Sequence, residues 1–100
     1  AGRQVIPAQW HADSTRPLSP HVQPADRDPG YGYQWWIPEN ADGEFLASGI
    51  YDQFIYVNTK RNVVIVKNSA NTIFNDEGYA PERFFGETTA IMRAIANSLP

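Results

Sequence analysis

Cysteine is absent from the 100 residues of this chain, which excludes a thiol nucleophile, a disulfide framework and a cysteine zinc site. Basic residues are also few, because eight Lys and Arg stand against eleven Asp and Glu and leave a formal net charge of −3. A nucleic acid or an anionic membrane needs a clustered basic face, and these basic residues are mostly single, so neither partner is expected. No apolar run approaches the roughly 20 residues that a membrane span needs.

Histidine is scarce as well. His11 and His21 are the only two, and they stand ten residues apart in segments expected to be short or irregular. This is not the spacing of a metal site, so we expect neither a metal nor an organic cofactor. The absence of cysteine suits the cytoplasm and the periplasm equally, and the compartment stays open. The start of the chain has no sustained apolar core and does not read as a signal peptide, so we interpret the chain as a segment of a longer protein.

What is present divides the chain into two parts. Residues 1–30 form a lead-in, with a short helix over 7–13 and a crossing over 14–30. The crossing holds Pro17, Pro20, Pro24 and Pro29, which prevent a helix or an interior strand. Residues 31–100 are the compact part, and the apolar fraction of 42% permits a core.

The compact part begins with segments typical of strands. We predict strands over 31–37, 45–51, 53–58 and 63–67, with a hairpin turn over 59–62. Strict alternation over 31–37 would turn Tyr31, Tyr33 and Trp35 to one side and Trp36 to the other. The run Val63-Val-Ile-Val66 is apolar on both faces, which predicts a central strand.

A long helix is predicted to follow, from Pro81 to about Ser98. One apolar stripe runs along it and is expected to cover a face of the sheet; its members are Phe84, Thr88, Ile91, Met92, Ile95 and Leu99. The fold class is therefore α+β, an antiparallel sheet of three to four strands with a long C-terminal helix packed on one face.

No serine of the chain has the partner that would activate it. A Ser-x-x-Lys pair sets the lysine amine one helical turn from the hydroxyl, and no serine here has lysine three positions later. Tyr56-Val57-Asn58 matches a Tyr-x-Asn element formally, but two fixed positions are a weak signal. We interpret Tyr56 and Asn58 as ordinary residues that share one face of a hairpin strand.

The order of segments nevertheless resembles a known superfamily. Gly2 to Trp10, then the proline-rich crossing, then Gly30-Tyr-Gly-Tyr-Gln-Trp-Trp-Ile37 look like the end of the helical region of β-lactamase-like serine hydrolases and the strand after it. Ala47-Ser-Gly-Ile-Tyr-Asp-Gln-Phe-Ile-Tyr-Val57 and Arg61 to Lys67 look like the catalytic edge strand and its successors. The resemblance covers essentially the whole chain and is closest to the 6-aminohexanoate-dimer (nylon-oligomer) hydrolases and related esterases. It implies the C-terminal part of a β-lactamase/transpeptidase-like α/β domain.

The resemblance also implies a site. The family's Lys-Thr-Gly element falls on Ala47-Ser48-Gly49, so the lysine is missing and a hydroxyl and the glycine remain as substrate-binding residues. The backbone N–H of Ile50 would be one of two oxyanion-hole donors. Trp36 would lie at the substrate cleft. Where Asp52 stands the family usually has glycine. Spacing alone favours an ordinary strand with small residues for close packing, and only the resemblance reverses that reading.

The resemblance therefore implies that the chain supplies the half of an acyl-enzyme serine hydrolase site that lacks the nucleophile. The parent protein would hydrolyse an amide or ester, and the missing lysine argues against recognition of a β-lactam carboxylate. The expected partners are a small amide or ester substrate and the N-terminal remainder of the same hydrolase, without which this chain should be inactive. Two alternatives remain: a non-enzymatic binding module with Tyr31, Tyr33, Trp35 and Trp36 as an aromatic platform, and a degenerate scaffold member of the superfamily. A platform needs several of these rings coplanar and exposed on one surface.

Overall fold

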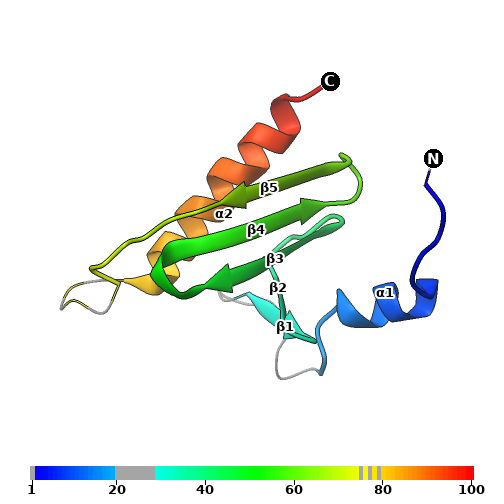
Figure 1. Ribbon diagram of the computed structural model, residues 1–100, viewed down its shortest axis with the longest axis horizontal. Coiled ribbons are helices and arrows are strands. Elements are labelled where there is room, and N and C mark those ends of the chain that lie inside the picture. The colour runs from blue at the N-terminus through cyan, green and yellow to red at the C-terminus, as the bar shows by residue number, and fades with distance from the viewer. Residues whose placement is uncertain (1, 20–28, 75, 77, 79) are drawn as a thin grey trace.

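The fold is an open antiparallel sheet with one long helix on a single face (Figure 1). The computed structural model describes residues 2–19, 29–74, 76, 78 and 80–100. Its elements are, in order, α1 (Ala8–Ser14), β1 (Gly30–Gly32), β2 (Trp35–Ile37), β3 (Glu44–Gly49), the 3₁₀ turn η2 (Ile50–Asp52), β4 (Gln53–Asn58), β5 (Val63–Lys67) and α2 (Pro81–Ser98). The strands lie in the order β1-β2-β3-β4-β5, and α2 contacts β4. The predicted α+β class with a C-terminal helix is confirmed.

The sheet has five strands because the first predicted strand folds back on itself. Tyr33 and Gln34 both have positive φ, 43° and 72°, and form the two-residue turn between β1 and β2. Tyr31 then lies opposite Trp36, and the centres of their rings are 4.5 Å apart. Residues opposite each other on paired strands point to the same face, so the alternation predicted through 31–37 was wrong.

The last strand is not central. β5 pairs with β4 and stands at the edge of the sheet as the structure describes it. Val64 and Val66 point away from α2 and are 65% and 59% exposed. The prediction of a strand from this apolar run is confirmed. The prediction that both of its faces are buried was wrong, since the described residues cover only one of them.

The core lies between the sheet and α2. Its buried members come from β3, β4, β5 and α2: Leu46, Phe54, Tyr56, Val63, Met92 and Ala96. Trp36, Ile65 and Phe85 pack against this cluster from its edges. The α2 helix is rotated from the predicted orientation, because Thr88 and Met92 are buried as expected while Ile91 is 62% exposed. The face toward the sheet carries small residues such as Ala96, which let the helix approach β4 closely.

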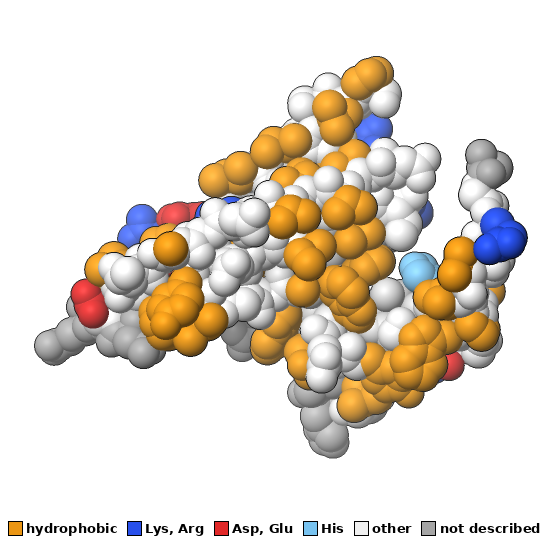
Figure 2. Space-filling view, in the orientation of Figure 1, with side chains coloured by type: hydrophobic (Ala, Val, Ile, Leu, Met, Phe, Trp, Pro, Cys, Tyr) orange, Lys and Arg blue, Asp and Glu red, His pale blue; other side chains and the backbone are white. Residues whose placement is uncertain are grey.

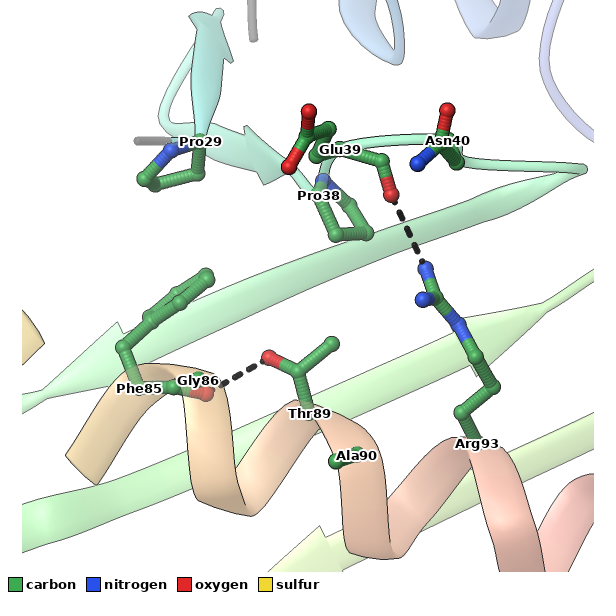
Figure 3. A pocket seen from close by; sticks show the side chains of 9 residues that line it. All are labelled: Pro29, Pro38, Glu39, Asn40, Phe85, Gly86, Thr89, Ala90 and Arg93. Atoms are coloured by element: carbon green, nitrogen blue, oxygen red, sulfur yellow. Dashed lines mark hydrogen bonds between the residues drawn. The ribbon is translucent and has the colours of Figure 1, made fainter. Parts of the chain in front are cut away.

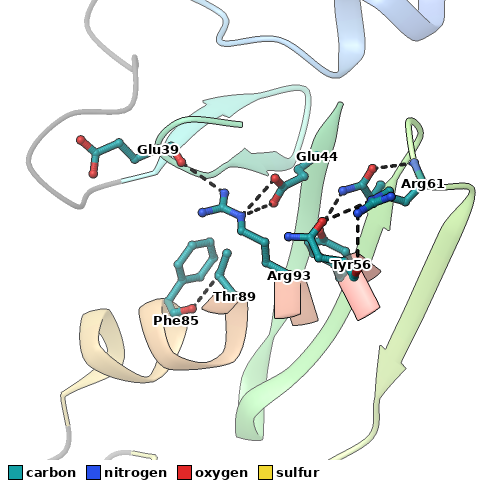
Figure 4. Close-up of polar contacts among 9 residues, drawn as sticks. Glu39, Glu44, Tyr56, Arg61, Phe85, Thr89 and Arg93 are labelled. Atoms are coloured by element: carbon teal, nitrogen blue, oxygen red, sulfur yellow. Dashed lines mark hydrogen bonds and ion pairs between the residues drawn. The ribbon is translucent and has the colours of Figure 1, made fainter. Parts of the chain in front are cut away.

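A polar network joins α2 to the sheet (Figure 4). The Nε atom of Arg93 lies 2.9 and 3.1 Å from the two carboxylate oxygens of Glu44, which is buried at the start of β3. A second guanidinium nitrogen of Arg93 donates to the carbonyl oxygen of Glu39, at 3.2 Å. On the neighbouring strand the side-chain amide of Asn58 donates to the hydroxyl of Tyr56, at 3.1 Å. Tyr56 and Asn58 are therefore buried strand residues on one face, as the sequence indicated.

The lead-in helix docks against the β1–β2 hairpin. It spans 8–14 where 7–13 was predicted, and the central part of the proline-rich crossing, residues 20–28, lies outside the described residues. The N–H of Leu18 donates to the carbonyl of Tyr31 at 2.8 Å. The backbone approaches so closely that a Cβ on Gly32 would lie 1.8 Å from the carbonyl oxygen of Arg16. Only glycine fits at this position without displacing the lead-in.

We expect opposite effects from alanine at two glycines. Gly32→Ala should lower the free energy of unfolding by about 1–3 kcal/mol, because backbone must move to admit the methyl group. Gly86→Ala, inside α2 and with open space where its Cβ would lie, should raise it by about 0.5–1 kcal/mol through helix propensity. Urea unfolding of the two variants and of the unsubstituted protein measures both changes. Equal effects at the two positions would contradict the close approach at Gly32.

The stability of the protein should fall in strongly alkaline solution because of Tyr56. Burial raises the pKa of the Tyr56 phenol, and the Glu44 carboxylate raises it further against the opposing hydrogen bond from Asn58. The unfolded chain then loses this proton first, from about pH 10, so stability is complete below that pH and falls as the pH rises toward the folded-state pKa. Denaturant unfolding from pH 9 upward should show a steeper loss in the parent than in Tyr56→Phe. Parallel losses would exclude Tyr56 as the cause.

Candidate functional site

The residues of the predicted oxyanion segment lie together at the end of β3. Ser48 and Gly49 are the last two residues of the strand, and Ile50 opens η2. All three are exposed, Ile50 to 57%. β3 is not an edge strand along its whole length, as the resemblance implied, because β2 lies beside it at the pair Trp36–Leu46. Beyond that pair the described residues give β3 a strand neighbour only on the β4 side, so Ser48 and Gly49 have one open edge.

Trp36 lies on the same face of the sheet as Ser48. It stands opposite Leu46, and Ser48 is two residues further along β3, so the two side chains are diagonal neighbours. The indole is half-buried, with its ring centre 4.5 Å from that of Tyr31 and 6.3 Å from that of Phe85 on α2. The fold thus brings Trp36 beside the segment 48–50, at the margin of the core.

The turn after Ile50 has an uncommon backbone. Tyr51 and Asp52 both have φ of 63°, in the left-handed region. Asp tolerates this conformation, whereas for a bulky residue such as Tyr it costs about 1–2 kcal/mol. Strained backbone of this kind persists only where surrounding contacts enforce it, and it is concentrated at functional sites.

Contacts from the segment that follows β5 enforce this turn. The backbone N–H of Asn71 donates to the carbonyl of Tyr51 at 3.2 Å, and its side-chain amide donates to the carboxylate of Asp52. The ring of Phe74 meets that of Tyr51 edge-on, with centres 4.7 Å apart. Sequence reasoning missed Asn71, because no local spacing connects a residue in a polar loop to a turn about twenty positions earlier.

The backbone of Ile50 directly precedes the two residues that these contacts hold. Its carbonyl accepts a hydrogen bond from the side-chain amide of Gln53 at 3.3 Å. None of the turn and loop hydrogen bonds found among the described residues has the Ile50 N–H as its donor. Gly49 and Gln53 pair across the base of the turn, so Ile50 lies in a three-residue loop at an exposed strand end. Such an arrangement can donate to an oxygen that approaches from outside.

The four aromatic residues of the β1–β2 hairpin do not form one surface. Tyr31 and Trp36 face α2, whereas Trp35 lies on the other face with its ring centre 4.9 Å from that of Phe45, at an interplanar angle of 77°. Tyr33, in the turn, packs on Trp10 of the lead-in at 5.5 Å and 49°. The rings are tilted and divided between two faces, so the arrangement does not favour a shared aromatic platform.

A cavity of about 190 Å³ lies between α2 and the connection from β2 to β3 (Figure 3). Its lining residues are Pro29, Pro38, Glu39, Asn40, Phe85, Gly86, Thr89, Ala90 and Arg93. The charge of Arg93 is already paired with Glu44, and the Thr89 hydroxyl donates to the carbonyl of Phe85. Arg93 therefore offers no uncompensated charge to a ligand in this cavity, and none of the predicted site residues lines it.

No protein-family model, no curated protein and no solved structure matches this chain. None of the helices in the described part is long and apolar enough to cross a membrane. Within the same residues no group of three or more His, Asp or Glu side chains is placed to hold a metal ion. His11 is exposed on α1 with its ring 6.0 Å from that of Phe45, and His21 lies outside the described residues.

Proposed function

We propose that this chain is the C-terminal segment of a serine hydrolase similar to the β-lactamase-like and 6-aminohexanoate-dimer hydrolases. In this proposal it contributes the strand and oxyanion-hole side of the site to a parent protein that cleaves amide or ester bonds. The observation that carries the proposal is the exposed end of β3, where the backbone N–H of Ile50 stands at an enforced turn. The half-buried Trp36 lies on the same face as Ser48 and supports a substrate cleft there.

The proposed chemistry is acyl transfer through a covalent intermediate. A serine hydroxyl outside this segment gives its proton to a nearby lysine and attacks the carbonyl carbon. The Ile50 N–H and the N–H of that serine hold the oxyanion, which collapses and expels the amine or alcohol with the proton. Water then attacks the acyl-enzyme and releases the acid. No metal ion or organic cofactor takes part in this scheme.

The substrate class follows from what β3 lacks. Ala47 stands where the related enzymes carry the lysine of the Lys-Thr-Gly element, so no ammonium group is available there for a substrate carboxylate. Ser48 retains a hydroxyl, and Gly49 leaves room for a substrate backbone to approach the strand. These residues favour a neutral amide or ester over a β-lactam.

The exposed apolar face of the sheet supports the N-terminal remainder of the same hydrolase as the partner. On the face away from α2, Ile55 pairs with Val66 and Val57 with Val64, and three of these four side chains are at least 40% exposed. Figure 2 shows hydrophobic side chains gathered over the central strands on this face. An apolar surface of this kind marks an interface. Covering it would also bury β5 on both sides, as its composition indicated.

The full-length protein should turn over a p-nitrophenyl ester and become labelled on one serine by a fluorophosphonate probe. That serine is expected upstream of Ala1, with a lysine three residues after it, and the 100-residue chain alone should show neither activity. A spectrophotometric assay and mass spectrometry of the labelled peptide measure the two results. Absence of both turnover and labelling in the full-length protein would refute the proposal and leave the scaffold alternative.

Two substitutions at Ile50 distinguish the contribution of its backbone N–H from that of its side chain. Ile50→Pro removes this N–H, and Ile50 follows Gly49, whose ψ of 165° is compatible with a proline after it. We expect a loss in kcat of about 100-fold to 1,000-fold, the usual effect of deleting one oxyanion-hole donor. Ile50→Ala is the matched control and should remain close to the parent. Similar activity in the two variants, with unchanged thermal unfolding, would show that the Ile50 N–H is not the donor.

A further inference from the structure

The turn between β3 and β4 and the segment after β5 are joined by contacts that converge on Asn71. The backbone N–H of this residue is bonded to Tyr51 and its side-chain N–H to Asp52. Its side-chain oxygen accepts the N–H of Ile73 at 3.2 Å, which fixes the orientation of the amide. Asn71 therefore uses its backbone donor and both ends of its side chain, and two of the three bonds reach residues with positive φ.

We propose that Asn71 is a positioning residue that holds η2 in its left-handed conformation and thereby fixes the direction of the Ile50 N–H. The catalytic consequence rests on the proposed function, because it assumes that this N–H receives the oxyanion. The conformational part does not, and it can be measured in the absence of any activity.

The contacts of Asn71 enforce the conformation of the turn, because the strained backbone is that of the turn. Tyr51 at φ of 63° is disfavoured on its own and would relax toward negative φ if nothing opposed it. The pair Gly49–Gln53 closes the loop at both ends, so a rotation at Tyr51 must be compensated within the three residues of η2. Ile50 is the first of these, and its peptide plane would turn with the change.

The side-chain bond to Asp52 is the contact that can be altered alone. Asp52 is buried, and its carboxylate needs a donor. The substitution Asn71→Asp keeps the shape of the side chain and the oxygen that accepts from Ile73, but it sets a second carboxylate against Asp52. Adding Asp52→Asn to Asn71→Asp restores an amide–carboxylate bond with the two roles exchanged, and asparagine also tolerates the left-handed region. This double exchange separates the bond itself from the identity of either residue.

The experiment uses the full-length protein with the variants Asn71→Asp, Asp52→Asn, the double exchange, and Asn68→Asp. The last adds the same charge at an exposed position of the same loop and serves as the control. Hydrogen exchange of the backbone amides of residues 51–53 should be about tenfold faster or more in Asn71→Asp, since a hydrogen bond to a charged group is lost. It should be unchanged in Asn68→Asp and return to within about threefold of the parent in the double exchange.

Ester turnover provides the second measurement. We expect kcat to fall about tenfold in Asn71→Asp with KM little changed, and to recover in the double exchange, because a donor that is misdirected weakens transition-state binding. Unchanged hydrogen exchange at 51–53 in Asn71→Asp overturns the proposal, and so does a double exchange that fails to recover the exchange rate or the fold. Faster exchange with unchanged kcat overturns the catalytic part. A parent protein without turnover refutes the proposed function, and the exchange data then still decide the conformational part.

Discussion

The arrangement of the two layers depends on the ion pair between Glu44 and Arg93. Glu44 opens β3 and is buried, and Arg93 reaches it from the middle of α2 with one nitrogen close to both carboxylate oxygens. The Glu44 carboxylate is buried, whereas the Arg93 side chain is 34% exposed, so loss of Arg93 would leave an uncompensated charge on the buried side of the pair. The Glu44–Arg93 pair fixes the position of the helix relative to the sheet. Because Arg93 must point to the start of β3, the rotation of α2 about its axis is set.

That rotation explains which apolar residues are buried. With Arg93 directed to Glu44, the next face of the helix presents Met92 and Ala96 to the sheet and leaves Ile91 at the margin. Ile91 and its neighbour Ile95 line a groove of about 360 Å³ beside β5, together with Ile65, Lys67, Phe84, Glu87, Thr88 and Met92. The sheet therefore leaves part of the apolar stripe of α2, at Ile91 and Ile95, uncovered. The same one-sided layering leaves the valines of β5 exposed on the opposite face.

β3 is held at both of its ends by different parts of the chain. At Glu44 the holding group comes from α2, and beyond Gly49 it comes from Asn71 in the segment that follows β5. Between these points β3 pairs with β4 along its whole length. A backbone donor at the end of such a strand sits on a rigid element, which is what electrostatic stabilisation of a transition state requires. In the proposed function, the site uses a strand that is paired along its whole length, and the serine and lysine come from another part of the protein.

Local pattern determined much of the fold. Enrichment in Ile, Val, Phe and Tyr predicted β4, the 59–62 turn separated it from β5, and Pro81 marked the start of α2, because these features depend on neighbours within a few residues. Local pattern did not single out Ser48 and Gly49 as site residues, because that prediction came only from the resemblance to a family. Tertiary structure alone decided the rest: the turn at Tyr33 that splits the first strand, the rotation of α2 by Arg93, and the meeting of Asn71 with Tyr51 and Asp52. Each of these depends on groups brought together from distant positions or on a left-handed backbone that residue type alone does not specify.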